Sequence, residues 1–136
     1  MSGQVKTADW NPRAYARFGD LRLRPGLDLL NAVGQMGAGD VVDLGCGNGA
    51  LGSALKARAG ARDLVGVDAS PAMLAKARGV AEYDSLQQAD IREWHPRRAP
   101  GLMISNAALH WVGEHEKLMP RLASMLGKGG TLAVQM

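Results

Sequence analysis

The chain has 136 residues, which is enough for one domain with its own hydrophobic core. Hydrophobic residues make up 46% of it and charged residues 21%, and these ordinary fractions exclude an intrinsically disordered chain. The formal net charge of +3 is too small to indicate a nucleic-acid partner. Cys46 is the single cysteine, so no internal disulfide can form, and we find no signal-peptide or membrane-span pattern. We therefore expect a cytoplasmic protein with no membrane partner.

Residues 1–37 are expected to form an N-terminal helical arm. Half of the aromatic residues lie in its first part, around Pro12: Trp10, Tyr15 and Phe18. Further along, Pro25 suits the first turn of a helix, and Gly37 is expected to end that helix. Apolar residues recur between them at helical spacing: Leu27, Leu30, Val33 and Met36.

Residues 38–136 are expected to form the core of the same single domain. Short apolar runs predict buried strands at 41–44, 64–67, 102–104 and 131–135, with a weaker strand at 85–89. Helices are predicted after the first strand, after Ser70-Pro71 and over 114–126, where Pro120 should kink or split the helix. This alternation predicts an α/β fold: a doubly wound, Rossmann-like parallel sheet with helices on both faces.

A glycine cluster follows the first predicted strand at residues 43–49, which read Asp-Leu-Gly-Cys-Gly-Asn-Gly. Glycines let the backbone turn tightly and let a ligand approach the start of the next helix. Residues 47–52 also satisfy the dinucleotide-binding pattern G-x-G-x-x-G. An NAD-dependent dehydrogenase is therefore one alternative.

Carboxylates near this loop count against that alternative. Asp43 lies within the strand and Asp90 follows the third strand, so a pyrophosphate would meet negative charge, whereas a cationic, phosphate-free nucleoside would gain from it. Asp68 closes the second strand at about the distance from Gly45 expected of a ribose-binding acid. Taken singly, these residues have simpler explanations: a strand-end cap for Asp68, a solvated turn for Asp90, a helix cap for Asn106 and packing for Cys46. Together they predict a ligand site at the carboxyl ends of successive strands.

These segments resemble the motifs of class I S-adenosylmethionine-dependent methyltransferases. Residues 43–49 resemble motif I, 66–74 resemble the motif whose acid takes the ribose hydroxyls, and 89–91 resemble the adenine-site motif. Residues 105–111 resemble the motif that borders the methionine part. The resemblance implies S-adenosyl-L-methionine as cofactor, with no metal and no catalytic base. It also implies a set of cofactor-binding residues: Asp43, Gly45, Gly47, Asp68, Ala69, Met73, Asp90, Ile91, Asn106 and Tyr15.

The arm at 9–30 and the segments 106–112, 120–122 and 132–136 resemble trans-aconitate 2-methyltransferases. That resemblance runs through nearly the whole chain and implies methylation of a carboxylate of a small polycarboxylic acid. A carboxylate with a pKa near 4 is already ionised at neutral pH, so the reaction needs no general base. The arm would fold over the cofactor, and four residues would lie near the substrate: Trp10, Arg22, Arg24 and His110.

The family's chains are longer, so this sequence is expected to stop after the fifth strand. Two alternatives follow from the resemblance: a cofactor-binding fragment with little or no turnover, and a methyltransferase for another small molecule. The strand at 131–135 would then be an exposed apolar edge with no charge or proline to protect it. This edge predicts a homodimer.

Overall fold

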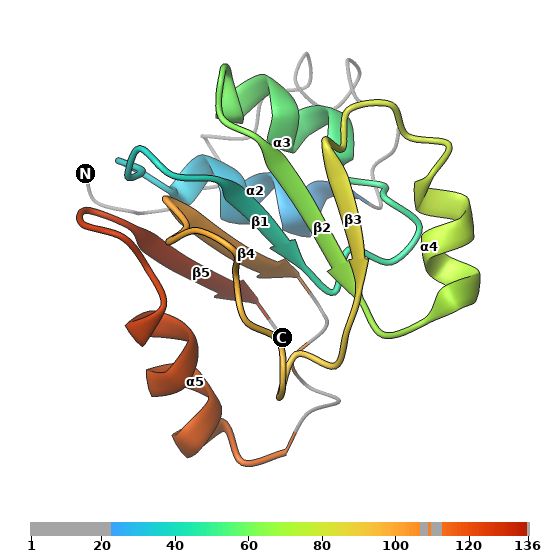
Figure 1. Cartoon of the computed structure of the whole chain (residues 1–136). Coiled ribbons are helices and arrows are strands. Elements are labelled where there is room, and N and C mark those ends of the chain that lie inside the picture. Colours follow the sequence, from blue (N-terminus) through green and yellow to red (C-terminus); the bar gives the residue numbers. More distant parts are fainter. Residues whose placement is uncertain (1–22, 107–108, 110–112, 136) are drawn as a thin grey trace.

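The structure is a computed structural model, which describes residues 23–106, 109 and 113–135. Among the predicted site residues, Trp10, Tyr15, Arg22 and His110 lie outside the described residues. The strands form one sheet in the order β3-β2-β1-β4-β5, and all neighbouring strands are parallel (Figure 1). Their bounds are β1 Val41–Leu44, β2 Leu64–Asp68, β3 Ser85–Gln88, β4 Leu102–Asn106 and β5 Thr131–Gln135. The predicted doubly wound sheet is confirmed.

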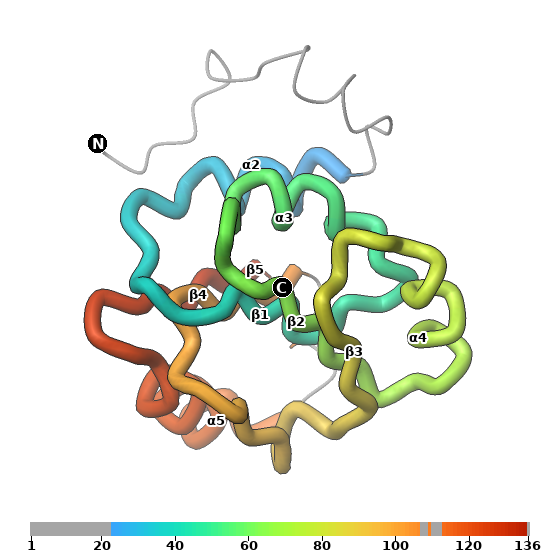
Figure 2. The backbone as a smooth tube through the Cα atoms, turned by 45° about the horizontal axis from the view of Figure 1, so that its top comes forward, coloured from blue at the N-terminus to red at the C-terminus, as the bar shows by residue number. Residues whose placement is uncertain are grey.

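Helices cover both faces of this sheet. Their bounds are α2 Arg24–Ala32, α3 Gly52–Ala59, α4 Pro71–Ala77 and α5 His115–Ser124. Figures 1 and 2 show α2 and α3 together on one face and α5 on the other. Successive strand residues alternate between the two faces, so Val41 packs in the α2–α3 core and Val42 in the α5 core. Within the described ranges, no helix combines the length and the apolarity needed to cross a bilayer.

The helix α2 begins as predicted but ends early. Pro25 stands in its first turn, yet the helix stops at Ala32, and Val33 is already extended with ψ 118°. The cause is Arg58 of α3, whose guanidinium donates to the carbonyl oxygens of Leu30 at 3.1 Å and Val33 at 2.6 Å. These bonds satisfy carbonyls that a longer helix would have used itself. The prediction that the helix runs to Gly37 is wrong.

The predicted alternation of strands and helices breaks between β3 and β4, where residues 89–101 contain turns but no helix. Trp94 covers the sheet where a helix would otherwise pack. It is only 4% exposed and packs in the α5 core. Its indole N–H donates to Oε1 of Gln87 at 2.7 Å, and its carbonyl oxygen accepts from Arg121 of α5 at 2.6 Å. One buried indole therefore covers this part of the sheet.

The helix α5 continues through Pro120 as one element of ten residues. Proline removes one backbone donor, but Leu118 and Leu122 on either side are buried against the sheet. Burying two leucines outweighs one missing hydrogen bond. Of the predicted kink or split at Pro120, the split is wrong, and the kink stays a prediction.

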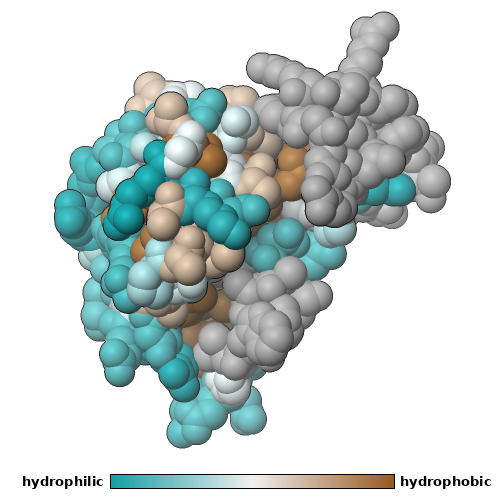
Figure 3. Space-filling model, turned by 90° about the vertical axis from the view of Figure 1, so that its right-hand side faces the viewer, coloured by the Kyte–Doolittle hydropathy of each residue, from teal (hydrophilic) through white to brown (hydrophobic). Residues whose placement is uncertain are grey.

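The two edges of the sheet differ in polarity. At one edge, β3 reads Ser-Leu-Gln-Gln, and the side of the molecule beyond it shows hydrophilic residues mixed with apolar ones (Figure 3). At the other edge, β5 reads Thr-Leu-Ala-Val-Gln and pairs with β4 on one side. Leu132 and Val134 of β5 are half-buried against the α5 core.

Candidate functional site

A pocket of about 380 Å³ opens at the carboxyl ends of β1 and β4. The chain order of the strands reverses between these two strands, which is where open α/β sheets bind ligands. The volume suits a small organic ligand. Its lining residues are Leu23, Asp43, Gly45, Cys46, Gly47, Asn48, Ala50, Leu51 and Asn106. Four of the predicted cofactor residues thus meet at one pocket.

The glycine loop is fastened to β2 through its own amides. Gly45 and Gly47 both have positive φ, at 75° and 57°. The N–H groups of Gly45 and Cys46 donate to the carbonyl oxygen of Val67 at 2.7 and 3.0 Å, and that of Gly47 donates to Oδ2 of Asp68 at 2.9 Å. A phosphate-binding loop would offer such amides to its ligand. Here they are used within the protein, so the loop is poorly suited to a pyrophosphate.

Asp68 joins the glycine loop to the start of α4. Its Oδ1 accepts from the N–H of Ser70 at 2.8 Å, while its Oδ2 holds Gly47. Ser70 caps α4 as predicted, since its Oγ accepts from the N–H of Met73 at 3.3 Å. Ala69 is exposed and Met73 is half-buried beside this turn. The strand-end cap expected of Asp68 is confirmed, and its ribose role stays a prediction.

Asp90 differs from Asp43 and Asp68 because its carboxylate is paired with a cation, Arg92. Arg92 donates to both of its carboxylate oxygens, at 2.6 Å for the shortest contact, and these hydrogen bonds lower the pKa of Asp90 to about 2. The alternative of a solvated turn residue fits Asp90, whose Oδ1 also accepts from the N–H of Arg92 at 2.9 Å, and its adenine role stays a prediction. Ile91, which follows it, is 8% exposed and packs in the α5 core.

Asp43 and Asn106 give the pocket its chemical character. The Asp43 side chain is 4% exposed, and burial raises its pKa to about 6, although a hydrogen bond from Tyr83 opposes the rise. The Oδ1 atom of Asn106 is buried and accepts no hydrogen bond from the residues that the structure describes, and the helix-capping alternative for it stays a prediction. Within the described part of the chain, this carboxylate has no cation and this acceptor has no donor, and both features favour a cationic ligand that carries N–H groups.

Tyr83 was not predicted from the sequence. Its hydroxyl donates to Oδ2 of Asp43 at 2.7 Å, across 40 positions of the chain. The one sequence signal for it is Gly66, because a glycine inside a strand marks a close approach by another group. Cys46 is buried, as its predicted packing role requires, and burial raises the pKa of its thiol to about 12.

Arg24 lies at the start of α2, next to the pocket-lining Leu23. Its guanidinium is exposed and its Nε is 3.7 Å from Oδ2 of Asp28, one turn along the helix. The predicted substrate contact of Arg24 stays a prediction.

A parallel sheet whose strand order reverses beside a glycine loop, with acids at the strand ends, defines a nucleoside-binding α/β domain. The particular family follows from the sequence: the profile of a methyltransferase domain matches residues 41–130, and the chain belongs to this family. The family membership decides against the NAD-dependent dehydrogenase.

Known proteins agree with this assignment. The chain is 47% identical over 130 residues to a trans-aconitate 2-methyltransferase of Paracidovorax citrulli, covering 94% of this chain and 50% of the relative. It thus spans about half the length of the curated relatives it matches. A crystal structure of an S-adenosylmethionine-dependent methyltransferase from Mesorhizobium loti has a TM-score of 0.68 at 28% identity, over 86% of this chain and 54% of that one. DesVI of Streptomyces venezuelae has a TM-score of 0.71 at 23% identity, over 96% and 57%, which shows the shared fold.

Proposed function

We propose that this chain is the cofactor-binding part of an S-adenosylmethionine-dependent O-methyltransferase that acts on a small carboxylic acid. The observation that carries the proposal is the pocket between β1 and β4, where a buried carboxylate has no cation among the described residues. S-adenosylmethionine is cationic, because it bears an ammonium and a sulfonium group, and it has no phosphate. It therefore matches a pocket that holds Asp43 and the unsatisfied oxygen of Asn106.

We assign the proposed binding residues to the parts of S-adenosylmethionine in turn, from the ammonium group to the adenine. Asp43 and Asn106 would receive the ammonium group, while Gly45 and Gly47 leave the backbone open to it. Further along the carboxyl edge of the sheet, the ribose would be held by Asp68, Ala69 and Met73. The adenine would lie by Asp90 and Ile91, and Tyr15 of the arm would contact the cofactor.

The methyl acceptor is proposed to be trans-aconitate or a similar polycarboxylic acid, on the strength of the 47% identity to a trans-aconitate 2-methyltransferase. When bound, the cofactor supplies an electrophilic methyl group on its sulfonium. An acceptor carboxylate is ionised at neutral pH, so the protein has to align it and neutralise it rather than deprotonate it. Arg24 is suited to pairing with a carboxylate, and Trp10, Arg22 and His110 are its proposed companions.

Calorimetric titration of the chain with S-adenosylhomocysteine tests cofactor binding. We expect the unchanged protein to bind, and Asp43→Asn to bind about 100-fold more weakly, because a charge-assisted hydrogen bond contributes about 2–3 kcal/mol. Asp40→Asn is the matched control, because that carboxylate is paired with Arg98 at 3.0 Å and lies at the opposite end of the sheet. A folded chain that gives no binding heat would refute the proposal.

Transfer of a labelled methyl group to trans-aconitate and to a panel of other acids tests the acceptor. Methylation of trans-aconitate in preference to the panel supports the proposed substrate, whereas preference for another compound replaces it. Binding of S-adenosylhomocysteine without any transfer would favour the cofactor-binding fragment.

Two further expectations remain proposals. The edge strand β5, with half-buried Leu132 and Val134, supports self-association of the chain. Sedimentation equilibrium at micromolar concentration would show a dimer if this holds and a monomer if it does not. The cytoplasmic location is likewise a prediction, which imaging of the tagged protein in its own cells would test.

A further inference from the structure

The ring of Tyr83 lies in a seat formed by three glycines from three different segments. Tyr83 is 9% exposed. A Cβ atom on Gly49 of the loop would lie 3.1 Å from the ring atom Cε2, and one on Gly52 of α3 would lie 2.8 Å from it. A Cβ atom on Gly66 of β2 would lie 2.9 Å from Cε1. A side chain at any of these positions would crowd the ring, so two glycines of the apparent dinucleotide fingerprint, Gly49 and Gly52, make room for the tyrosine.

The contacts with these glycines place the Tyr83 hydroxyl beside the carboxylate of Asp43, which lines the pocket. Gly66 pairs with Asp43 across the β1–β2 register, so a ring lying over Gly66 is next to Asp43. The hydroxyl donates to Oδ2 of Asp43 at 2.7 Å, and both residues are buried. Asp43 also lines the pocket. Tyr83 therefore reaches Asp43 from inside the protein and leaves the pocket side of the loop free.

No other described group near Asp43 stabilises its charge. The ionisable groups beside it are Asp68 at the end of β2 and Cys46 of the loop, besides Tyr83 itself. The nearby polar residues of β4, Ser105 and Asn106, are neutral. An ionised Asp68 raises the pKa of Asp43, and burial raises it more, while the Tyr83 hydroxyl lowers it. Among the described residues, the Tyr83 phenol is thus the one group that favours the Asp43 anion in the protein without ligand.

We propose that Tyr83 is a positioning residue for cofactor binding, which holds the Asp43 carboxylate at the pocket in the orientation and charge state that a ligand ammonium group requires. The phenol itself stays protonated, since burial and the neighbouring Asp43 raise the pKa of Tyr83 far above its usual value. It therefore donates a hydrogen bond over the whole physiological pH range. This inference rests on the proposed binding of S-adenosylmethionine.

The test compares Tyr83→Phe with the unchanged chain in calorimetric titrations with S-adenosylhomocysteine from pH 5 to 8.5. Phenylalanine keeps the ring in its seat and removes only the hydroxyl. Loss of a hydrogen bond to a charged group raises the carboxyl pKa by about one unit. We expect the acid limb of the affinity profile to move up by about one pH unit, with a loss of about 3-fold at pH 6.5 that nearly disappears at pH 8.5. The ligand's own titration is common to both proteins and cancels in the comparison.

A purely structural role for Tyr83 would weaken binding equally at every pH, and that result would overturn the proposal. Trp94→Phe is the matched control, because it removes another buried aromatic donor, the one bonded to Gln87 at 2.7 Å on the opposite face. It should leave the pH profile in place. Carbon-13 NMR titration of the aspartate carboxyls is a second measurement on the unchanged protein. If the Asp43 carboxyl titrates near 4, the proposal fails whether or not Tyr83→Phe folds.

Failure of the proposed function gives a different result. In that case the unchanged chain binds no S-adenosylhomocysteine at any pH, while the NMR titration still reports the link between Tyr83 and Asp43. Binding with identical pH profiles for both proteins would instead reject the role of Tyr83 and keep the cofactor.

Discussion

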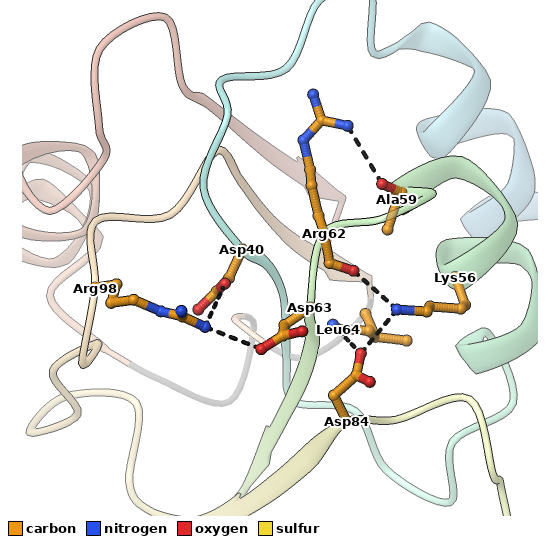
Figure 4. Close-up of polar contacts among 8 residues, drawn as sticks. All are labelled: Asp40, Lys56, Ala59, Arg62, Asp63, Leu64, Asp84 and Arg98. Atoms are coloured by element: carbon orange, nitrogen blue, oxygen red, sulfur yellow. Dashed lines mark hydrogen bonds and ion pairs between the residues drawn. The ribbon is translucent and has the colours of Figure 1, made fainter.

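The two ends of the sheet both carry aspartates, but among the described residues all three at the amino end are paired with cations, and only Asp90 of the three at the carboxyl end is. At the amino end, Asp40, Asp63 and Asp84 each stand directly before a strand (Figure 4). Arg98 donates to Asp40 at 3.0 Å and to Asp63 at 2.9 Å, and Lys56 donates to Asp84 at 2.9 Å. These pairs tie the β3–β4 connection and α3 to the starts of the strands.

At the carboxyl end, Asp43 and Asp68 have no cation among the described residues. Their hydrogen-bond donors are the Tyr83 hydroxyl and the backbone amides of Gly47 and Ser70. The pKa values separate the two ends: that of Asp84 is lowered by the N–H of Leu64 and by Lys56, whereas that of Asp43 is raised to about 6 by burial.

The difference supports the proposal that the paired acids serve the fold and that Asp43 and Asp68 are left for a ligand. A compensated carboxylate stabilises the structure that contains it, while a buried and uncompensated one costs free energy until a cation arrives. Asp90 is the exception at the carboxyl end, because Arg92 already pairs with it at 2.6 Å. The case for direct ligand contact is therefore stronger for Asp43 than for Asp90.

The largest expected effect on stability comes from the glycines at the two ends. Gly49 has φ 85° and a Cβ there would lie 2.9 Å from Val80, whereas Gly60, before β2, has φ 62° and open space around it. Gly49→Ala adds overpacking to backbone strain and should cost about 3 kcal/mol of unfolding free energy. Gly60→Ala adds strain alone and should cost about 1 kcal/mol. Urea denaturation measures both, and equal losses would mean that Tyr83 and Val80 do not fill the space over Gly49.

Asp43→Asn should stabilise the ligand-free protein while it weakens binding. The folded-state pKa of Asp43, about 6, lies above its ordinary value of 3.8, so the folded protein holds this proton more tightly than the unfolded chain. Stability from this group is then complete below pH 4 and is lost as the pH rises to 6. The neutral side-chain amide of the Asp43→Asn variant does not ionise, so the variant does not lose this stability. Denaturation at several pH values should show that the stability of the variant, relative to the unchanged protein, increases with pH, by up to about 3 kcal/mol at pH 7.

An advantage that is the same at pH 4 and pH 7 would contradict this account, because it would not come from ionisation. A loss of stability at pH 7 would show that the Asp43 anion is compensated after all. Either result would remove the contrast between the two ends of the sheet.

The strands and most helix starts were predictable because they depend on local pattern. Apolar runs marked β1, β2, β4 and β5, and the Ser70-Pro71 pair marked the start of α4. The position of the pocket also followed from the sequence, since parallel strands bring their carboxyl ends to one edge.

The features that were missed depend on contacts between distant residues. Arg58 ends α2 by bonding carbonyls 25 and 28 positions earlier, and Trp94 replaces a helix through its packing against α5. The bond between Tyr83 and Asp43 spans 40 positions. Hydrophobic periodicity carries no signal for such pairs, because it reports which face of an element is buried and not what meets that face.

The smallest expected effect comes from Asp84→Asn at the amino end. The Asp84 side chain is 39% exposed, and the pKa of its carboxyl is lowered, first by the N–H of Leu64 and then by Lys56. An amide oxygen can still accept from Leu64, so only the pair with Lys56 is lost, at a cost of about 0.5 kcal/mol for an exposed pair.

The sign of the pH dependence should be opposite to that of Asp43. Because the folded-state pKa of Asp84 lies below 3.8, its stabilisation is present above that pH and disappears as the pH falls through the folded-state value. The difference in stability between Asp84→Asn and the unchanged protein should be full at pH 7 and should shrink as the pH falls below 3.8, with the affinity for S-adenosylhomocysteine unaltered. A weaker affinity in this variant would mean that the amino-end acids also support the ligand, and the division of the aspartates between fold and site would fail.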